Sequence, residues 1–329
     1  MSASLGLDGL DVEALMELQY RFPLTPTPYC DVAERLGVPV GELLGRLRRL
    51  RSLGALKRVG FYFNHRSAGR RAALVAYSTG GDGGLVEELA RLYRGDPEAT
   101  HVYLRDHPVY DVWVVVKRGS RGELEEHVAS VASRLGLRYA ILYSTRTYKL
   151  SVKYDLHRGV SRAGLHSRVN PDPPRPEDLG YPSSLARSLR SLPLEERPYR
   201  GIARTHGLGE EEAVEAAREM LRAGVLGDPG AALDGWRIGF RYNAMTAASP
   251  ARGGPGELCE CLSKVPEVTH VVLREPWPPG SWGLPCFFVV HARSEGLLRE
   301  ALRGALDACG VGEHVAIRSL RDLKPGAVR

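Results

Sequence analysis

The feature that most constrains the fold of this chain is an internal repeat with a spacing of about 170 residues. Phe22-Pro-Leu24 and Pro28-Tyr29 return as Leu192-Pro-Leu194 and Pro198-Tyr199, and His101 with Leu104-Arg105 returns as His270 with Leu273-Arg274. Because similar sequences fold alike, the 329 residues are predicted to form two homologous halves, roughly 1–155 and 183–329.

Each half is predicted to contain a winged helix-turn-helix followed by a ferredoxin-like domain, so the fold class is an α+β tandem repeat. In the first half, apolar residues at helical spacing predict helices at 12–20, 29–36 and 40–53, and a strand-like segment follows at 56–64. The β-α-β-β-α-β order follows from strands expected at 72–78, 99–104 and 110–117, helices expected at 84–93 and 121–135, and closing strands expected near 138–144 and 147–154. The second half repeats this order at 242–248, 256–263, 268–273, 285–291, 294–309 and 314–319.

The domain boundaries follow from this order and from one proline-dense segment, 170–176, which is expected to be a linker because repeated prolines exclude helix and sheet. The predicted domains are a winged helix-turn-helix at 1–66, a ferredoxin-like domain at 67–160, a Pro/Arg-rich linker at 161–182, a degenerate helix-turn-helix at 183–236 and a second ferredoxin-like domain at 237–329.

Composition favours a globular protein of the cytoplasm. Apolar residues make up 43% of the chain, no apolar run is long enough for a membrane span, and the acidic start, with Asp8 and Asp11, is not that of a signal peptide. The five cysteines form no CxxC pair and are expected to be reduced thiols. Cys259 and Cys261 are close in sequence, but a metal site is not expected there.

Arginine is unusually frequent, since only six of the 45 basic residues are lysine and the net charge is +6. Genome composition or a hot habitat would explain this excess. Arginine also binds carboxylates and phosphates with two parallel hydrogen bonds, so a polyanionic small ligand and a nucleic acid remain alternatives.

The stretch from His101 to Trp113 gathers histidine, tyrosine, arginine and tryptophan side chains between two expected strands. Two strands that meet at a polar turn would present these side chains on one surface. A general acid near neutral pH is the role to which histidine is best suited. This stretch is therefore the candidate active site.

A winged helix-turn-helix joined to a ferredoxin-like domain resembles the Lrp/AsnC regulators, and the arginines of 46–51 could contact phosphates. The corresponding second-half helix, near 210–220, is acidic. A dimer that binds a symmetric DNA site needs two matching recognition helices. The loop 22–28 is also long, and a regulator has no need of the His101 stretch. Nucleic acid is therefore not the expected partner.

The motifs narrow the resemblance to the siroheme decarboxylases, which are Lrp/AsnC-like enzymes built from two related subunits. In the first half the resemblance rests on Phe22-Pro-Leu24, Pro28-Tyr29, Arg58-Val-Gly60, Asn64-His-Arg66 and the His101 stretch. In the second half it rests on Gly239-Phe-Arg-Tyr-Asn243-Ala-Met245 and on Trp282 with Phe287-x-x-x-His291. The chain resembles a natural fusion of both subunits, which form an intramolecular pseudo-dimer and could assemble further into a homo-oligomer.

This resemblance implies a carboxy-lyase that removes the C12 and C18 acetate carboxylates of siroheme, giving 12,18-didecarboxysiroheme in alternative haem or haem d1 biosynthesis. It implies no cofactor and no protein-bound metal, because the iron arrives inside the substrate. A tetrapyrrole rich in carboxylates would also account for the arginine excess. A non-catalytic haem or tetrapyrrole sensor on the same fold stays open as the alternative.

The expected catalytic residues are His101 and His107 as acids, Tyr103 as a relay and Arg105 as a carboxylate ligand. The alternatives are structural histidines, and for Arg105 an ion pair with a neighbouring aspartate. The other candidates are expected to bind the substrate. Lys57, Arg58 and Arg66 would bind further carboxylates, His65 would face the macrocycle or its iron, and Trp113 would stack on the ring. His270 and Arg274 would reach the substrate from the second half. Wing charges and core packing are their alternatives, and His291 is a weaker candidate.

The second half departs from the family pattern at several positions. Its histidine strand, 270–274, lacks a tyrosine, and the glycine-rich segment 227–235 replaces the basic wing of the first half. Val102 and Asp111 are departures in the first half. One working site per chain is therefore expected, centred on first-half residues, with the second half as its wall.

Overall fold

The computed structural model describes residues 6–325, which fall into two compact units. The helix unit comprises residues 6–68, 149–241 and 291–298, and the sheet unit comprises 69–148, 242–290 and 299–325. Each unit therefore combines segments from both halves of the repeat. Every helix in the described part of the chain is too short or too polar to cross a bilayer.

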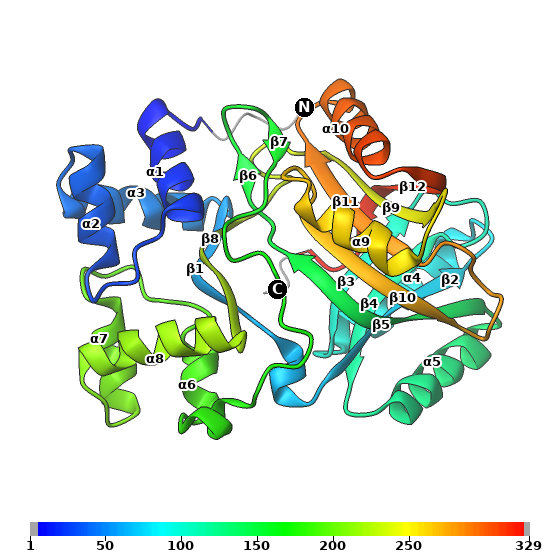
Figure 1. The fold of residues 1–329 in the computed structure, drawn as a ribbon, viewed down its shortest axis with the longest axis horizontal. Coiled ribbons are helices and arrows are strands. Elements are labelled where there is room, and N and C mark those ends of the chain that lie inside the picture. The colour runs from blue at the N-terminus through cyan, green and yellow to red at the C-terminus, as the bar shows by residue number, and fades with distance from the viewer. Residues whose placement is uncertain (1–5, 326–329) are drawn as a thin grey trace. The chain divides into compact units, whose positions relative to one another are not determined.

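The helix unit contains both helix-turn-helix motifs (Figure 1). Its elements are α1 (Gly9–Tyr20), α2 (Pro28–Leu36), α3 (Val40–Ser52), β1 (Leu56–Phe63), η1 (His65–Ala68), β6 (Tyr154–Asp155), β7 (Val160–Ser161), η2 (Pro176–Leu179), α6 (Ser183–Ser188), α7 (Pro198–Thr205), α8 (Glu210–Ala223) and β8 (Leu226–Leu233).

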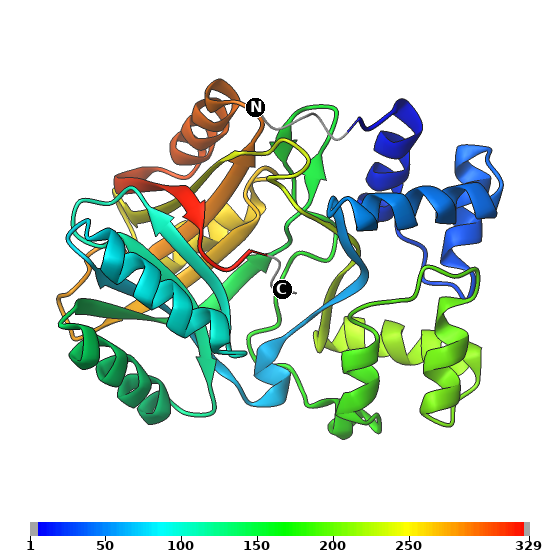
Figure 2. The ribbon, with the colours of Figure 1, turned by 180° about the vertical axis from the view of Figure 1, so that it is seen from behind.

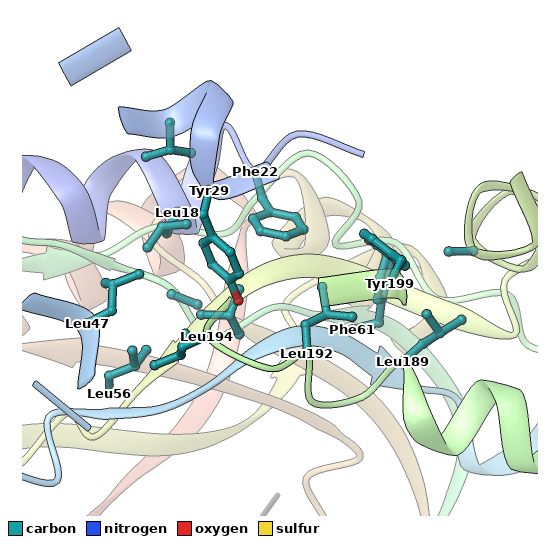
Figure 3. Close-up of a cluster of buried hydrophobic side chains, with 14 of the residues drawn as sticks. Leu18, Phe22, Tyr29, Leu47, Leu56, Phe61, Leu189, Leu192, Leu194 and Tyr199 are labelled. Atoms are coloured by element: carbon teal, nitrogen blue, oxygen red, sulfur yellow. The ribbon is translucent and has the colours of Figure 1, made fainter. Parts of the chain in front are cut away.

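The wing strands of the two motifs pair with each other. β1 and β8 form an antiparallel ribbon in which Val59 lies opposite Ala231 and Gly60 lies opposite Gly230. The helices of both motifs pack on this ribbon around a single hydrophobic core, in which Tyr29 is the sequence counterpart of Tyr199 (Figure 3). The two motifs are thus one folded body, which follows from their shared apolar core.

The sheet unit contains both ferredoxin-like domains. Its elements are β2 (Arg71–Ser78), α4 (Gly83–Gly95), β3 (Ala99–Arg105), β4 (Val112–Arg118), α5 (Arg121–Leu135), β5 (Arg138–Leu150), β9 (Tyr242–Pro250), α9 (Pro255–Lys264), β10 (His270–Trp277), β11 (Cys286–Ala292), α10 (Glu295–Ala308) and β12 (Val311–Asp322), where the ends of β5 and β11 and the start of α10 run into the helix unit.

The strands of the sheet unit close on themselves. Their order is β10-β5-β2-β4-β3-β12-β9-β11, and β10 also pairs with β11. Helices α4 and α5 cover the outer face of the first-half strands, where Val75, Val102 and Val114 belong to the core beneath them (Figure 2). A second cluster, which includes Trp113 and Phe287, fills the inner face. The two halves therefore share one enclosed apolar layer.

Most predicted elements are present within a few residues of their expected bounds, and two expectations need correction, one on the strands at 138–154 and one on the cysteines. The strands expected at 138–144 and 147–154 are largely one continuous strand, β5. The glycine-rich segment 227–235, expected in the position of the first-half wing, supplies most of β8. The cysteines expected to be reduced form two disulfides, Cys259–Cys286 and Cys261–Cys309, which join α9 to β11 and to the residue that follows α10. Cys30 is a free thiol.

Candidate active site

A row of polar side chains lies along the inner face of β3. Because side chains alternate along a strand, His101, Tyr103 and Arg105 share the face opposite Val102, whose side chain belongs to the outer core. The rings of His101 and Tyr103 are 6.2 Å apart, and the guanidinium of Arg105 lies 4.9 Å from the Tyr103 ring centre. The structure thus brings together three of the four predicted catalytic residues.

The second half repeats this row on β10 with one change. His270 lies opposite Val289 and Val272 lies opposite Phe287, so His270, Val272 and Arg274 face the inner layer. Nδ1 of each strand histidine lies 3.0 Å from the hydroxyl of the threonine before it, Thr100 or Thr269. The second half therefore keeps the histidine and the arginine and has lost only the tyrosine.

The two arginines of these rows reach into the opposite half of the repeat. Nη1 of Arg105 donates to the carbonyl of Ile317 on β12 at 3.2 Å. Nη1 of Arg274 donates to the carbonyl of Leu142 on β5 at 3.1 Å and to the hydroxyl of Ser144 at 2.9 Å. These bonds are counterparts under the repeat, and each arginine crosses the seam between the halves.

Arg274 has no carboxylate within ion-pair distance among the described residues, and its guanidinium lies over the Phe287 ring at 5.3 Å. Burial lowers the pKa of Arg274 to about 9, because removal from water disfavours the charged form. The side chain still carries its charge at neutral pH. An anionic ligand would find a cation here that no internal carboxylate neutralises.

His107 belongs to the turn between β3 and β4 and lies among aromatic rings. Its Nδ1 accepts from the backbone N–H groups of Val109 and Tyr110 at 3.2 and 3.0 Å. Its ring centre lies 6.0 Å from Trp113, and Trp113 itself is almost fully buried. Burial lowers the pKa of His107, and nearby Asp106 opposes that shift.

The aspartates next to Arg105 have structural roles. Asp106 accepts from Nε of Arg318 on β12 at 2.6 Å. Asp111 accepts from the backbone N–H of Thr79 at 2.9 Å and from its hydroxyl at 2.5 Å. Both aspartates hold the ends of the His107 turn in place, and Asp111, a departure from the family pattern, fixes the start of β4.

The remaining predicted ligands lie in the helix unit. Lys57 pairs with Asp234 at 3.3 Å. Arg58 is buried, and its Nη1 donates to the carbonyls of Phe61 and Arg190 at 3.1 and 2.8 Å. His65 and Arg66 form the start of the short helix η1, where both are partly exposed.

Three of the four arginines of α3, the counterpart of a DNA-reading helix, bind other groups of the protein, and the fourth is Arg51. Arg46 binds Asp8 at 2.6 Å and Asp11 at 3.2 Å. Arg49 also binds Asp11, and Arg48 donates to the carbonyl of Leu194 at 2.8 Å. The equivalent helix α8 begins with three glutamates. A pair of matching basic readers is therefore lacking in the described part of the chain.

Trp282 is part of a second-half sequence motif, but its sequence context indicates no role for it. In the structure its ring centre lies 5.3 Å from His107 and 5.5 Å from Trp113. Tyr110, which stacks on His107 at 6.0 Å, lies within the candidate stretch, but the sequence indicates no individual role for it either. Only the pairing of β10 with β11 brings Trp282 to the first-half turn, and local sequence carries no signal of that contact.

Comparison with known proteins agrees with this architecture. Residues 67–149 and 237–324 match a family model described as an AsnC-like ligand binding domain. Residues 11–56 and 186–226 match a model described as a siroheme decarboxylase NirDL-like HTH domain. Together the two models cover both halves of the repeat.

Curated relatives match over most of the chain. The chain is 27% identical over 299 residues to the siroheme decarboxylase NirDL subunit of Paracoccus denitrificans, covering 91% of this chain and 90% of that protein. It is 28% identical to a siroheme decarboxylase of Hydrogenobacter thermophilus, covering 84% and 82%. A solved structure of siroheme decarboxylase NirDL in co-complex with an iron-uroporphyrin III analogue has a TM-score of 0.62 at 21% identity, covering 96% of this chain and 92% of that one, which shows a common fold.

Proposed function

This chain belongs to the AsnC-like ligand-binding domain family, and we propose that it is a siroheme decarboxylase that combines both subunits in one chain. The observation that carries the proposal is the similarity to the NirDL subunit over nine-tenths of both chains. The helix-turn-helix match and the histidine and arginine rows of the sheet unit support it. The products are 12,18-didecarboxysiroheme and CO₂, for alternative haem or haem d1 biosynthesis.

The proposed reaction is a redox-neutral replacement of carboxylate by hydrogen at C12 and C18. The bond between the acetate methylene and its carboxylate breaks, CO₂ leaves, and the electron pair stays on the methylene carbon and its pyrrole. A proton delivered to that carbon gives a methyl group. The enzyme must therefore hold the carboxylate and supply one proton per acetate, which makes it a carboxy-lyase.

We assign the proton to His101, with Tyr103 as its relay, and the scissile carboxylate to Arg105. The contacts along β3 support this grouping, because the three side chains follow one another on one face. Arg274 is the best-supported further carboxylate ligand, because its charge has no internal counter-ion among the described residues. The site is completed, in this proposal, by His107.

The other substrate contacts stay proposals of less direct support: His270 and Trp113 in the sheet unit, and Lys57, Arg58, His65 and Arg66 in the helix unit. Arg58 already donates hydrogen bonds to two backbone carbonyls, so it has the least support as a substrate ligand. The enzyme needs no resident cofactor or protein-bound metal in this proposal, since iron comes with the substrate. We propose a cytoplasmic location, where the two disulfides would be of the kind found in the intracellular proteins of hyperthermophiles.

Anaerobic incubation of the purified chain with siroheme tests the proposal. Mass spectrometry should show the pigment losing two CO₂ units in succession, and the His101→Ala/His107→Ala variant should leave it intact. Tight binding with no loss of mass would instead identify a tetrapyrrole sensor. A DNA mobility shift that weakens steeply with salt would identify a regulator.

A further inference from the structure

The turn that carries His107 leaves one ring nitrogen available. Two backbone N–H groups, of Val109 and Tyr110, donate to Nδ1, so the neutral ring must carry its proton on Nε2. Nε2 forms no hydrogen bond with any residue of the described chain. The ring therefore presents a single N–H donor in a fixed direction.

Aromatic rings from both halves hold the His107 imidazole in this orientation. Tyr110 stacks on it with an interplanar angle of 20°, and Trp113 meets it edge-on at 83°. Trp282, from the segment between β10 and β11, lies closest, at 5.3 Å between ring centres. The second half therefore supplies one wall of this aromatic box.

Trp282 is itself fixed by several contacts. Its indole N–H donates to the carbonyl of Leu284 at 2.9 Å. Its ring lies 5.5 Å from Trp113, 6.3 Å from Tyr110 and 5.9 Å from Phe287. Because these contacts fix the position of the Trp282 indole, the indole can in turn fix the orientation of the His107 ring.

We propose that Trp282 is a positioning residue: it keeps His107 in the Nε2–H tautomer and aims that donor, so the second half takes part in the first-half site. Its catalytic consequence rests on the proposed function. A neutral imidazole whose Nδ1 is already occupied donates a hydrogen bond to a carboxylate or carbonyl oxygen but does not readily give up its proton. The acid role then falls to His101.

The charged surroundings of His107 agree with a neutral ring. The charged group that faces it from its own turn is Asp106, whose carboxylate is engaged by Arg318 of β12. The segment from β10 to β11 presents an indole to the ring, and β4 presents another. Removing the Trp282 indole would admit water and ease protonation at Nδ1.

Histidine NMR of the ligand-free protein tests the proposal without reference to activity. In the wild-type chain, ¹⁵N chemical shifts of His107 should report the Nε2–H tautomer. Trp282→Leu should give mixed tautomers and raise the pKa of His107 toward its ordinary value, and Trp282→Phe should retain the wild-type pattern. Trp236→Ala, in the helix unit, is the matched control and should change nothing. Unaltered His107 signals in folded Trp282→Leu would overturn the proposal.

A double-mutant cycle tests the catalytic consequence. Trp282→Leu should lower kcat by up to about tenfold with little change in KM, since a misaimed group costs rate rather than binding. If Trp282 acts through His107, the same substitution should have no further effect in the His107→Gln background. An equal loss in both backgrounds would contradict the proposal. If siroheme is not turned over but the NMR response is present, the proposed function fails and the positioning role stands.

Discussion

His101 and His107 differ in what surrounds their ring nitrogens. Nδ1 of His107 is occupied by two backbone donors within an aromatic box. Nδ1 of His101 lies beside the Thr100 hydroxyl, which can donate or accept, and the ring lies next to Tyr103. These different surroundings are the basis for the different roles that we propose for the two histidines.

We expect His101→Gln to lower kcat for siroheme by about a hundredfold or more, because it removes the proposed general acid. His107→Gln should cost no more than about tenfold, because the glutamine amide keeps a donor near the position of Nε2. Single-turnover assays that follow CO₂ release would measure both. A larger loss of kcat in His107→Gln than in His101→Gln would instead make His107 the general acid.

At the scale of elements, the wing ribbon depends on a glycine pair. Gly60 has a φ of 153°, and a Cβ there would lie 2.5 Å from the carbonyl oxygen of Arg190. Its partner Gly230 has a φ of 128°, and a Cβ there would lie 2.2 Å from the carbonyl oxygen of Leu18. Both strands can approach the neighbouring backbone only because they lack a side chain at this point.

Gly60→Ala should therefore lower the free energy of unfolding by about 1–3 kcal/mol, through overpacking against backbone that cannot yield. Gly45→Ala in α3 is the matched control, because an added Cβ there meets no atom within 4 Å other than those of its own helix. That change should raise stability by about 0.5–1 kcal/mol, since alanine favours helix. Urea unfolding would compare the two. Equal effects would exclude the close approach at Gly60.

The disulfides link α9 to β11 and to the end of α10 in the second half. Each bridge should contribute about 2–4 kcal/mol by restricting the unfolded chain. Alkylation of the denatured, unreduced protein should label Cys30 alone, and reductant should lower Tm by calorimetry. In Cys30→Ala the response to reductant should be unchanged. Labelling of all five cysteines without reductant would show that the bridges are absent.

At the scale of the whole molecule, stability should fall with pH below neutrality. Burial lowers the pKa values of His107 and His127, and the unfolded chain, where histidine titrates near 6.5, binds more protons. The contribution of these two histidines to the free energy of unfolding is therefore complete above about pH 6.5 and is lost as the pH falls below it. Tm should be lower at about pH 5 than at about pH 7, and His127→Gln should reduce the difference. His166→Gln, at an exposed position, is the control. If it reduces the difference equally, the partly buried rings of His107 and His127 are not the cause.

The sequence by itself determined the repeat, the order of elements in each half and the polar row from His101 to Arg105. These follow from local periodicity and from strand alternation, which neighbouring residues fix without reference to the rest of the chain. The family resemblance came from the same local motifs. The β-α-β-β-α-β order could likewise be predicted from periodicity alone.

Only the tertiary structure decided how the two halves combine. The pairing of β1 with β8, the closure of the sheet through β10 and β11, and the contact of Trp282 with His107 all join residues far apart in the chain. The disulfides and the reach of Arg105 and Arg274 across the seam belong to the same class. Local pattern shows which face of an element is apolar. Local pattern does not show which other element will pack against that face. Hydrophobic burial has no preferred direction, so the partner is selected by shape and by strand pairing across the whole fold.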